Sequence, residues 1–388
     1  MARVKDTAAI LVTGATGNIG ARILVDLLEY RSSVQIIALV RGSSVTEARS
    51  RLNTCIRRIA PDLVDWGQMR AIDVVCGDIT DGHLGLTCEA WNELSESVTH
   101  IIHAAASTQW HLPLECARAV NVSGTANVLR LARQARKRGR LVKLAHLSTA
   151  YVCGEMSGSV TEVNHLGALH FANTYEQTKW EAEQELLSAK DDLPMIIVRP
   201  SITVGDSRTG LAVTYNVLYP PLKYILTGKL TALSCPPHNR LDLVPVDYVA
   251  KAVTHLTLNS PSLSGQIYHL TAGLSRSSSI ASIVKRAIAV VSTKGMRPSD
   301  CSFAEPHESA KGDLRSNRKA VALMEMYSSY LRFERDFDDR NARQALKDSD
   351  IRLPDIDSYL DVLLQAFISH EILNNRRIAG TAQTGSLI

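Results

Sequence analysis

The stretch LVTGATGNIG, residues 11–20, decides the fold of this 388-residue chain. It ends an apolar run, spaces Gly14, Gly17 and Gly20 three residues apart, and continues into the amphipathic stretch ARILVDLLEY at 21–30. Such glycines allow a tight turn between a strand and a helix. They also let the backbone approach a pyrophosphate, whose charge the helix N-terminus then meets. The stretch predicts a dinucleotide site; a tight turn without a ligand is the alternative.

Short apolar runs alternate with amphipathic stretches from residue 8 to about residue 204. The apolar runs are AAILVTG (8–14), VQIIALV (34–40), AIDVVCGD (71–78), HIIHAAA (100–106), KLAHLSTAYV (143–152) and PMIIVRP (194–200). Runs that are apolar almost throughout are typical of parallel strands covered on both faces. We therefore predict an α/β fold with a Rossmann-type, doubly wound parallel sheet.

The pattern also suggests how the chain divides. We expect residues 1–204 to form the nucleotide-binding domain, and 239–273, with the strand-like GQIYHLTAG at 265–273, to rejoin it. Residues 205–238 and 274–375 should form a smaller, mostly helical substrate-binding subdomain, with a break near Pro354. The polar end at 376–388 is expected to be a flexible tail.

Composition excludes several classes of protein. The 43 Lys and Arg residues against 39 Asp and Glu give a net charge of +4, too weak to indicate nucleic acid as a partner. No run approaches the roughly 20 apolar residues that span a bilayer, so we expect no integral membrane segment. The start, MARVKDTAAILVTG, has the pattern of a buried strand rather than a signal peptide. The seven cysteines lack metal-ligand spacing, which predicts no metal and a reducing, cytoplasmic setting.

The second apolar run is followed by an arginine that bears on cofactor choice. Arg41 stands where an NAD-selective fold would carry an acidic residue for the ribose hydroxyls. A guanidinium can instead pair with a 2′-phosphate, which favours NADPH. Arg51 could reach the same phosphate from the next helix, or it could be an ordinary solvated arginine.

Polar and small residues follow the third and fourth apolar runs. Asp78 could accept hydrogen bonds from an adenine amino group, and Ala104, Ala105 and Ala106 would let a cofactor lie against the strand end. Asn121 could brace the central helix and strand. Each signal alone is weak, because an Asp in a turn and alanines in a tight crossing need no ligand.

A phenol and an amine lie four residues apart in NTYEQTKWEAE, residues 173–183. We expect Thr174 to cap a helix with Gln177 as its capping-box partner, so that Tyr175 and Lys179 project from one face. The ammonium should then lower the pKa of Tyr175 from about 10 towards neutrality and make it a proton donor. Thr149, at the end of the fifth apolar run, would add a hydroxyl at the same place. In isolation such a pair commonly arises by chance.

Taken in order, these motifs resemble those of an extended short-chain dehydrogenase/reductase. More narrowly, the chain resembles the thioester reductase and fatty acyl-CoA reductase (male sterility) group. This group includes the terminal reductase domains of carboxylic acid reductases and nonribosomal peptide synthetases. The resemblance is carried by LVRGSSVTEARSRL (39–52), GDITDGHLGL (77–86), NVSGTANVLRLA (121–132), HLSTAYVCG (146–154), VRPSITVGDSRTG (198–210) and LDLVPVDYVA (241–250). It spans about residues 8–275 and continues only loosely in FERDFDDRNARQAL (333–346).

The resemblance implies roles for particular residues. Thr149, Tyr175 and Lys179 match the catalytic triad of the group, with Thr149 where sister families often carry Ser. Pro200 and Ile202 match positions that hold the nicotinamide end. The residues that match NADPH-binding positions are Gly14, Thr16, Gly17, Asn18, Ile19, Arg41, Arg51, Asp78 and Ile79. Gly20, Ala104, Ala105, Ala106 and Asn121 complete the cofactor site that we expect.

The implied activity is NADPH-dependent reduction of an acyl thioester to an aldehyde, or further to an alcohol. The acyl carrier would be coenzyme A or a phosphopantetheinyl carrier protein. One alternative is an NAD(P)-dependent short-chain dehydrogenase or epimerase that acts on an alcohol, a ketone or a sugar nucleotide. Another is a nonenzymatic NADPH sensor, which the presence of both Tyr175 and Lys179 disfavours.

Three further stretches have both a functional and a plain interpretation. RQARKRGR (133–140) could dock an acidic carrier protein or simply be a solvated helix end. RDFDDR (335–340) could bind a metal, but acidic residues before a helix more often meet its dipole. The set Tyr215, Leu218, Tyr219 and Tyr224 could line an acyl pocket or belong to the core.

Overall fold

The computed structural model describes residues 8–30, 33–61, 66–165, 169–261, 264–298, 300–303, 327 and 330–373. The tail predicted at 376–388 lies outside these residues, as does most of the stretch 304–329. None of the described helices has both the length and the apolar character needed to cross a membrane.

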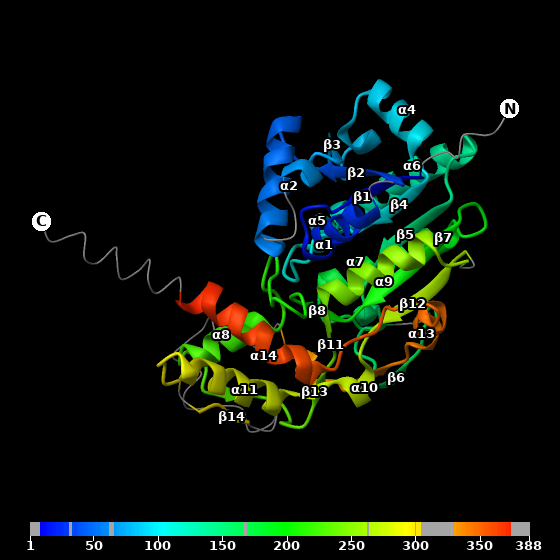
Figure 1. Cartoon of the computed structure of the whole chain (residues 1–388). Coiled ribbons are helices and arrows are strands. Elements are labelled where there is room, and N and C mark those ends of the chain that lie inside the picture. The colour runs from blue at the N-terminus through cyan, green and yellow to red at the C-terminus, as the bar shows by residue number, and fades with distance from the viewer. Residues whose placement is uncertain are drawn as a thin grey trace, which may run out of the picture.

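A seven-stranded parallel sheet forms the centre of the larger part of the molecule (Figure 1). Its strand order is β12-β7-β5-β4-β1-β2-β3, so the order reverses between β1 and β4. This confirms the predicted doubly wound fold and adds β12, next to β7, from the stretch 265–273. The strands are β1 (Ala8–Thr13), β2 (Val34–Val40), β3 (Ile72–Cys76), β4 (His100–His103), β5 (Lys143–Leu147), β7 (Met195–Pro200) and β12 (Gln266–Leu270).

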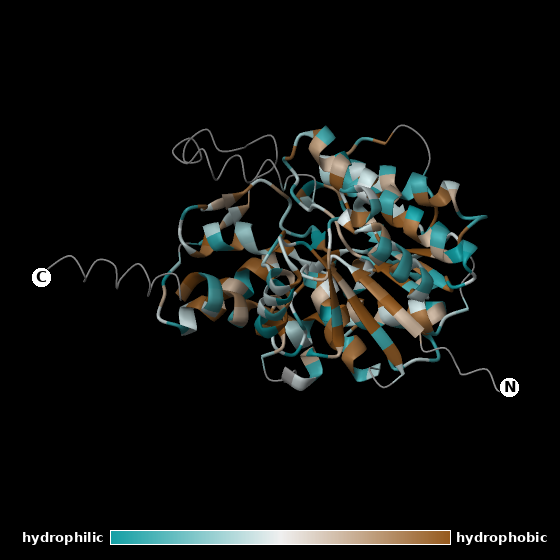
Figure 2. Ribbon diagram, turned by 90° about the horizontal axis from the view of Figure 1, so that it is seen from above, coloured by the Kyte–Doolittle hydropathy of each residue, from teal (hydrophilic) through white to brown (hydrophobic). Residues whose placement is uncertain are grey.

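Helices cover both faces of this sheet because alternate strand residues point to opposite sides. On β1, Ile10 and Val12 pack into one core with α1, α2 and α9, whereas Ala9 and Leu11 pack into another with α4, α6 and α7. Figure 2 shows the strands as largely hydrophobic ribbons. The helices are α1 (Asn18–Leu27), α2 (Val45–Ile59), α3 (Trp66–Met69), α4 (Cys88–Ser97), α5 (Leu114–Arg118), α6 (Gly124–Lys137), α7 (Thr174–Ser188) and α9 (Val246–Leu258).

A third core builds a smaller lobe around α8, α11 and α14, which lie together in Figure 1. Its regular elements and those that connect it to the sheet are α8 (Tyr219–Leu226), α10 (Gly273–Arg276), α11 (Ile280–Thr293), α13 (Arg340–Leu346) and α14 (Ile356–Phe367). Four short strand pairs accompany them: β8 (Ile202–Val204) with β11 (Leu243–Pro245), β9 (Ala232–Leu233) with β14 (Ser302–Phe303), β10 (Arg240–Leu241) with β13 (Ser278–Ser279), and β6 (Gly158–Val160) with β15 (Arg335–Phe337).

Strand β15 differs from the mostly helical structure expected for residues 274–375. Its stretch pairs in parallel with β6, which lies more than 170 residues earlier. Alternation places Arg335 and Phe337 on the buried side and leaves Asp336 exposed. Three residues are too few for this period to stand out in the sequence.

Candidate active site

The glycine-rich turn joins β1 to α1 and leaves the start of that helix open. Gly14 has a φ of 68°, and a Cβ at this position would lie 2.5 Å from the backbone of Ala104. A Cβ on Gly20 would lie 2.2 Å from the Gly14 carbonyl oxygen. Helix α1 begins after Gly17 with no side-chain cap and no acidic residue in its first turn. Its open N–H groups and dipole therefore suit a pyrophosphate.

A cleft, here called the nucleotide cleft, opens at the carboxyl ends of the strands, where the strand order reverses. It brings together predicted residues from four separate parts of the chain. Together with the open end of α1, this lining fits a dinucleotide. The described lining residues are Gly14, Ala15, Thr16, Gly17, Leu39, Val40, Arg41, Gly77, Asp78, Ile79, Ala104, Ala105, Ala106, Ser107, Thr108, Gln109 and Val120.

Two predicted cofactor residues lie next to this cleft rather than on its lining. Gly20 is buried behind the turn, where its missing side chain permits close packing. The Arg51 guanidinium donates a hydrogen bond to the Arg41 carbonyl oxygen at 2.7 Å. This bond brings both guanidinium-bearing residues to the same edge of the cleft.

Asn121 also lies off the lining, and it connects two parts of the site. Its Oδ1 accepts a hydrogen bond from the Ser107 N–H at 2.8 Å, and its Nδ2 donates to the Ser107 carbonyl at 3.1 Å and to Thr178 Oγ1 at 2.9 Å. Ser107 follows β4, whereas Thr178 belongs to α7. Asn121 therefore fixes the helix that carries Tyr175 against the edge of the nucleotide cleft.

A second pocket, here called the catalytic pocket, continues from the nucleotide cleft through Thr108 and Gln109, which line both. Six predicted residues line it: Asn18, Ile19, Thr149, Tyr175, Pro200 and Ile202. A bound dinucleotide and a substrate could therefore meet at this junction. The other described lining residues are Thr108, Gln109, Trp110, His111, Ser148, Tyr151, Ser201, Thr203, Asn216, Val217, Pro220, Tyr327 and Tyr330.

Tyr175 is hydrogen-bonded to Thr149, but its acidity is opposite to our expectation. Burial raises the pKa of Tyr175 to about 12, the bond from Thr149 opposes this rise, and the Glu176 carboxylate adds to it. The predicted lowering by Lys179 was wrong for this state of the protein, because desolvation outweighs any attraction from the amine. The phenol is therefore neutral at physiological pH and can donate a hydrogen bond.

Lys179 lies beneath the catalytic pocket, with 2% of its surface exposed. Its Nζ donates to the Leu147 carbonyl oxygen at 2.7 Å and lies 3.0 Å from His146 Nε2. Burial lowers the pKa of this amine to about 8, and the Glu183 carboxylate partly opposes the fall. The structure therefore anchors Lys179 to the end of β5, the strand that leads to Thr149.

The cap of α7 is Asn173 rather than the predicted Thr174. Asn173 Oδ1 accepts from the Glu176 N–H at 2.9 Å, and its Nδ2 donates to Glu176 Oε1 at 3.0 Å. The Thr174 hydroxyl instead donates to the carbonyl oxygens of Trp110 and Leu112, each at 3.1 Å. The capping box was therefore predicted one residue too far along the chain. Thr174 instead fixes the loop that forms one wall of the catalytic pocket.

A buried ion pair supports α7 from the side of the sheet. Arg199 Nε and Nη2 lie 2.9 Å and 2.6 Å from the two carboxylate oxygens of Glu183, and both side chains are fully buried. This two-point contact joins β7 to the helix that carries Tyr175 and Lys179.

Two charged stretches are placed by the structure away from the proposed chemistry. The end of α6 and residues 138–140 lead into the start of β5. They therefore lie at the amino ends of the strands, whereas the catalytic pocket lies at the carboxyl ends. In the stretch 335–340, Asp339 lies 2.6 Å from Arg276 and 2.9 Å from Arg343. Among the described residues, no three potential metal ligands come together.

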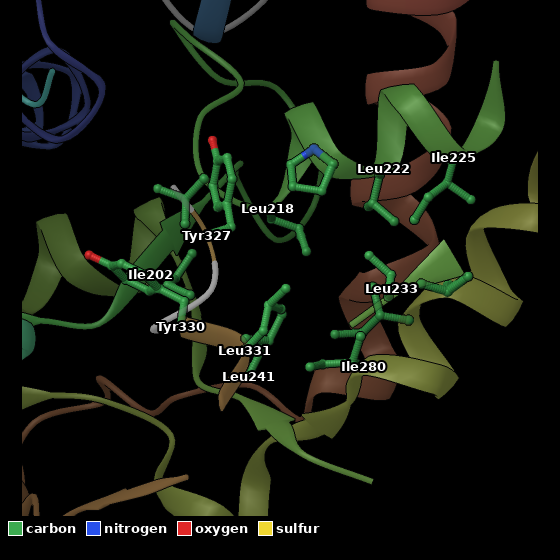
Figure 3. Close-up of a pocket in the computed structure, with 14 residues that line it drawn as sticks. Ile202, Leu218, Leu222, Ile225, Leu233, Leu241, Ile280, Tyr327, Tyr330 and Leu331 are labelled. Carbon is green, nitrogen blue, oxygen red and sulfur yellow. The ribbon is translucent and has the colours of Figure 1, made fainter. Parts of the chain in front are cut away.

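The aromatic set proposed for an acyl pocket is mostly core. Tyr215 and Tyr219 pack against Phe367, and Tyr224 packs against the same core from the side. Only Leu218 lines the apolar space next to the catalytic pocket (Figure 3). Sequence analysis did not identify several residues that line the catalytic pocket and the adjoining apolar space. The main ones are 108–111, Val217, Tyr327 and Tyr330. Residues 108–111 (TQWH) lie one residue after the alanines at 104–106, beyond Ser107, and this nearness was the available signal for them.

Comparisons with known proteins agree with this geometry. The model of the family described as male sterility protein matches residues 12–253. The aldehyde reductase lnaA of Aspergillus flavus is 29% identical over 272 residues, which cover 67% of this chain and 25% of that protein. The glycine betaine reductase ATRR of Emericella nidulans is 32% identical over 276 residues, 68% of this chain and 21% of that protein. The chain thus spans about a quarter of the length of these curated relatives.

A solved structure shares the fold along almost the whole chain. The terminal R domain from the myxalamid PKS-NRPS biosynthetic pathway superimposes with a TM-score of 0.77 at 26% sequence identity. The match covers 96% of this chain and 92% of that one. It therefore includes the smaller lobe as well as the sheet.

Proposed function

The chain belongs to the male sterility protein family, an NAD(P)-binding family, and we propose that it is an NADPH-dependent reductase of acyl thioesters. The product is the aldehyde and a free thiol. The observation that carries this proposal is the hydrogen-bonded pair Thr149 and Tyr175 on a pocket that continues into a dinucleotide-shaped cleft. The relatives named as reductases and the R-domain neighbour support the same reaction class.

The residues of the nucleotide cleft would hold the cofactor. Gly14, Thr16 and Gly17 would receive the pyrophosphate at the start of α1. Asp78 and Ile79 would receive the adenine, and Ala104, Ala105 and Ala106 would lie under the dinucleotide. Arg41 and Arg51 would meet the 2′-phosphate that distinguishes NADPH, while Asn18, Ile19, Pro200 and Ile202 would enclose the nicotinamide end. When bound, NADPH supplies the hydride.

Tyr175 acts as the proton donor to the thioester carbonyl oxygen. The hydrogen bond with Thr149 lowers the pKa of Tyr175. A Thr149 hydroxyl that donates to the phenol oxygen would leave the phenol O–H free for the substrate. A neutral phenol stabilises the oxyanion as it develops and then protonates it. When the tetrahedral product collapses, its hydroxyl would return the proton to the Tyr175 phenolate as the C–S bond breaks. The aldehyde is released, and the thiolate takes a proton from water to leave as the free thiol. Lys179, anchored below, would orient the nicotinamide ribose.

The substrate would arrive already activated on a pantetheine arm, as an acyl-coenzyme A or on a carrier protein. The R-domain neighbour favours the carrier protein as a partner. The basic stretch at 133–140 does not suit this docking. It lies at the amino ends of the strands, and the thioester must reach the catalytic pocket at their carboxyl ends.

We also propose the division of the chain that its sequence suggests. Residues 1–204 together with 239–273 would bind the nucleotide, and 205–238 with 274–375 would bind the substrate. All seven cysteines are free thiols, which supports a reducing compartment such as the cytoplasm.

The test is NADPH consumption with a panel of acyl-coenzyme A thioesters, aldehydes and ketones, with products identified by mass. Thioesters should be consumed and yield aldehydes, and Tyr175→Phe should slow this by about 10²–10⁴-fold because it removes the proton donor. Tyr224→Phe, on α8 and outside both pockets, is the matched control and should keep the rate. NADPH oxidation that occurs with ketones but not with thioesters would replace this proposal with the dehydrogenase alternative.

A further inference from the structure

An apolar cavity, here called the apolar chamber, lies in the smaller lobe next to the catalytic pocket (Figure 3). Its free volume, with open solvent included, is about 480 Å³, and the space open to the centre of a water molecule is about 40 Å³. Its described walls come from α8, α11, the short strands β8, β9 and β10, and residues 327, 330 and 331. The described lining residues are Ile202, Val217, Leu218, Pro221, Leu222, Ile225, Leu233, Leu241, Ile280, Ile283, Val284, Tyr327, Tyr330 and Leu331.

The chamber adjoins the catalytic pocket. Ile202, Val217, Tyr327 and Tyr330 line both spaces. In Figure 3, Ile202, Tyr327 and Tyr330 stand on one side of the chamber, and Leu222, Ile225 and Ile280 stand on the other. A molecule whose reacting carbonyl lies beside Tyr175 could therefore extend past Ile202 into the chamber.

The chemistry of the wall is nearly uniform. Among the described lining residues, every side chain apart from the two tyrosines is aliphatic, and none is charged. The Tyr330 hydroxyl is engaged with the Glu176 carboxylate, and its ring stacks on Trp110 at 4.8 Å with an interplanar angle of 5°. Tyr330 therefore contributes a fixed aromatic ring at the junction, while its polar atom is already satisfied.

Val217 marks the same junction by its backbone. It has a φ of 50°, a left-handed conformation that a β-branched residue rarely adopts. Strain of this kind persists where the surrounding structure demands it, commonly at ligand sites. Here it places the valine side chain on the wall shared by the two spaces.

We propose that the apolar chamber binds the acyl tail of the substrate and selects an uncharged aliphatic chain. This inference rests on the proposed function and adds the substrate class. An ammonium or carboxylate on the tail would lose its hydration without meeting a partner on the described wall. Each methylene that enters the chamber should raise kcat/KM about fourfold, until the chamber is full.

The experiment measures kcat/KM for S-acyl pantetheines from acetyl through butyryl, hexanoyl and octanoyl to decanoyl. The value should rise along the series and then level off. An ω-aminohexanoyl thioester should react at least about a hundredfold more slowly than hexanoyl, because its ammonium would be buried without a counter-charge. Equal values along the series, or equal values for the charged and uncharged hexanoyl groups, would overturn the proposal.

Val284→Phe tests the position of the tail. Val284 is buried on α11 at the wall of the chamber, so a phenyl ring there should reduce the octanoyl-to-butyryl ratio of kcat/KM by about tenfold. Ala289→Phe adds the same ring at an exposed position of the same helix and should leave the ratio unchanged. Should Val284→Phe fail to fold, Val284→Ala provides the opposite test, since extra space should move the optimum to longer chains.

A binding measurement separates this proposal from the proposed function. Octanoyl pantetheine, titrated calorimetrically into the protein, should bind more tightly than acetyl pantetheine whether or not turnover occurs. If no thioester is reduced, the proposed function fails, and the chamber is judged by this titration alone. Equal affinities for the two thioesters would overturn the inference about the chamber.

Discussion

In the reaction that we propose, Tyr175 would gain its suitability as a proton donor from burial rather than from a depressed pKa. A phenol whose pKa is raised to about 12 stays protonated at physiological pH. In the reducing direction the group must give a proton to an oxyanion, which is a stronger base than phenolate. The neutral state is then the useful one, and the hydrogen bond from Thr149 keeps the phenol oriented.

Lys179 should make the free energy of unfolding depend on pH. Its pKa falls from the ordinary 10.5 to about 8 in the folded protein, because burial disfavours the charge. Between these values the unfolded chain holds a proton that the folded chain has released, so rising pH favours folding. The free energy of unfolding of the wild type, relative to Lys179→Met, should therefore increase from pH 8 to pH 10.5. Urea denaturation at several pH values measures this difference, and a flat difference would contradict the lowered pKa.

Arg41 should determine the preference for NADPH. Arg41→Ala removes the guanidinium nearest the proposed 2′-phosphate position, so KM for NADPH should rise about 10–100-fold while KM for NADH changes little. Steady-state kinetics with both nucleotides measure the two constants. Arg70→Ala, an exposed arginine outside the cleft, is the control. An equal rise of KM for both nucleotides would show that Arg41 does not read the 2′-phosphate.

At the scale of elements, the turn between β1 and α1 depends more on Gly20 than on Gly17. A Cβ at Gly20 would lie 2.2 Å from the backbone of Gly14, whereas a Cβ at Gly17 would lie 3.2 Å from it. Gly20→Ala should therefore lower the free energy of unfolding by about 1–3 kcal/mol, and Gly17→Ala by less, because only the first forces the backbone apart. Chemical denaturation of the nucleotide-free variants compares them. Equal losses would show that α1 can shift without cost.

Elements with a long, regular hydrophobic pattern could be predicted from the sequence. Features that depend on a choice between neighbouring residues, or on a distant partner strand, could not. The six apolar runs and the strand-like stretch at 265–273 identified the seven strands of the sheet, since a buried parallel strand is apolar on both faces. The cap of α7 was misplaced because Asn173 and Thr174 are both good caps, and only the loop beside Trp110 decides which one is used. Likewise, β15 is a strand only because it pairs with β6. The two strands are so far apart in the sequence that this pairing could not be predicted from it.

At the scale of the whole molecule, a buried ion pair fixes the glycine-rich turn to the start of the smaller lobe. Arg22 on α1 pairs with Asp26 on its own helix and with Asp206, which follows β8, and all three are almost fully buried. The Val213 N–H donates to Asn18 Oδ1 at 3.0 Å along the same boundary. The segment 205–213 is thus held against the helix that would bind the pyrophosphate.

Removing Arg22 should therefore destabilise the whole protein and not only one local contact. Arg22→Met removes the one cation that contacts both buried carboxylates, although Asp206 keeps Arg208 Nε at 3.9 Å. It should lower the free energy of unfolding by about 3–5 kcal/mol. Arg340→Met is the control, because Arg340 pairs with Asp338 at an exposed position and should contribute less than about 1 kcal/mol. Urea denaturation measures both, and similar small losses would show that the lobes are joined mainly by apolar packing.

The site between the lobes was the least predictable part. The residues of the nucleotide cleft follow strand ends of one sheet, so their convergence follows from the topology alone. The wall of the apolar chamber comes from segments between residues 202 and 331 that no single period connects. Tyr215 and Tyr219 have the spacing of a pocket wall, but packing against Phe367 turns them into the core.

The most direct test of the account follows the hydride. Octanoyl pantetheine is incubated with the protein and NADPH that carries deuterium at both C4 positions of the nicotinamide, and the products are analysed by mass. The account predicts octanal with one deuterium at its carbonyl carbon, together with free pantetheine, and a strong loss of this product in Tyr175→Phe. Binding of NADPH without any labelled aldehyde or alcohol from the thioester series would contradict it.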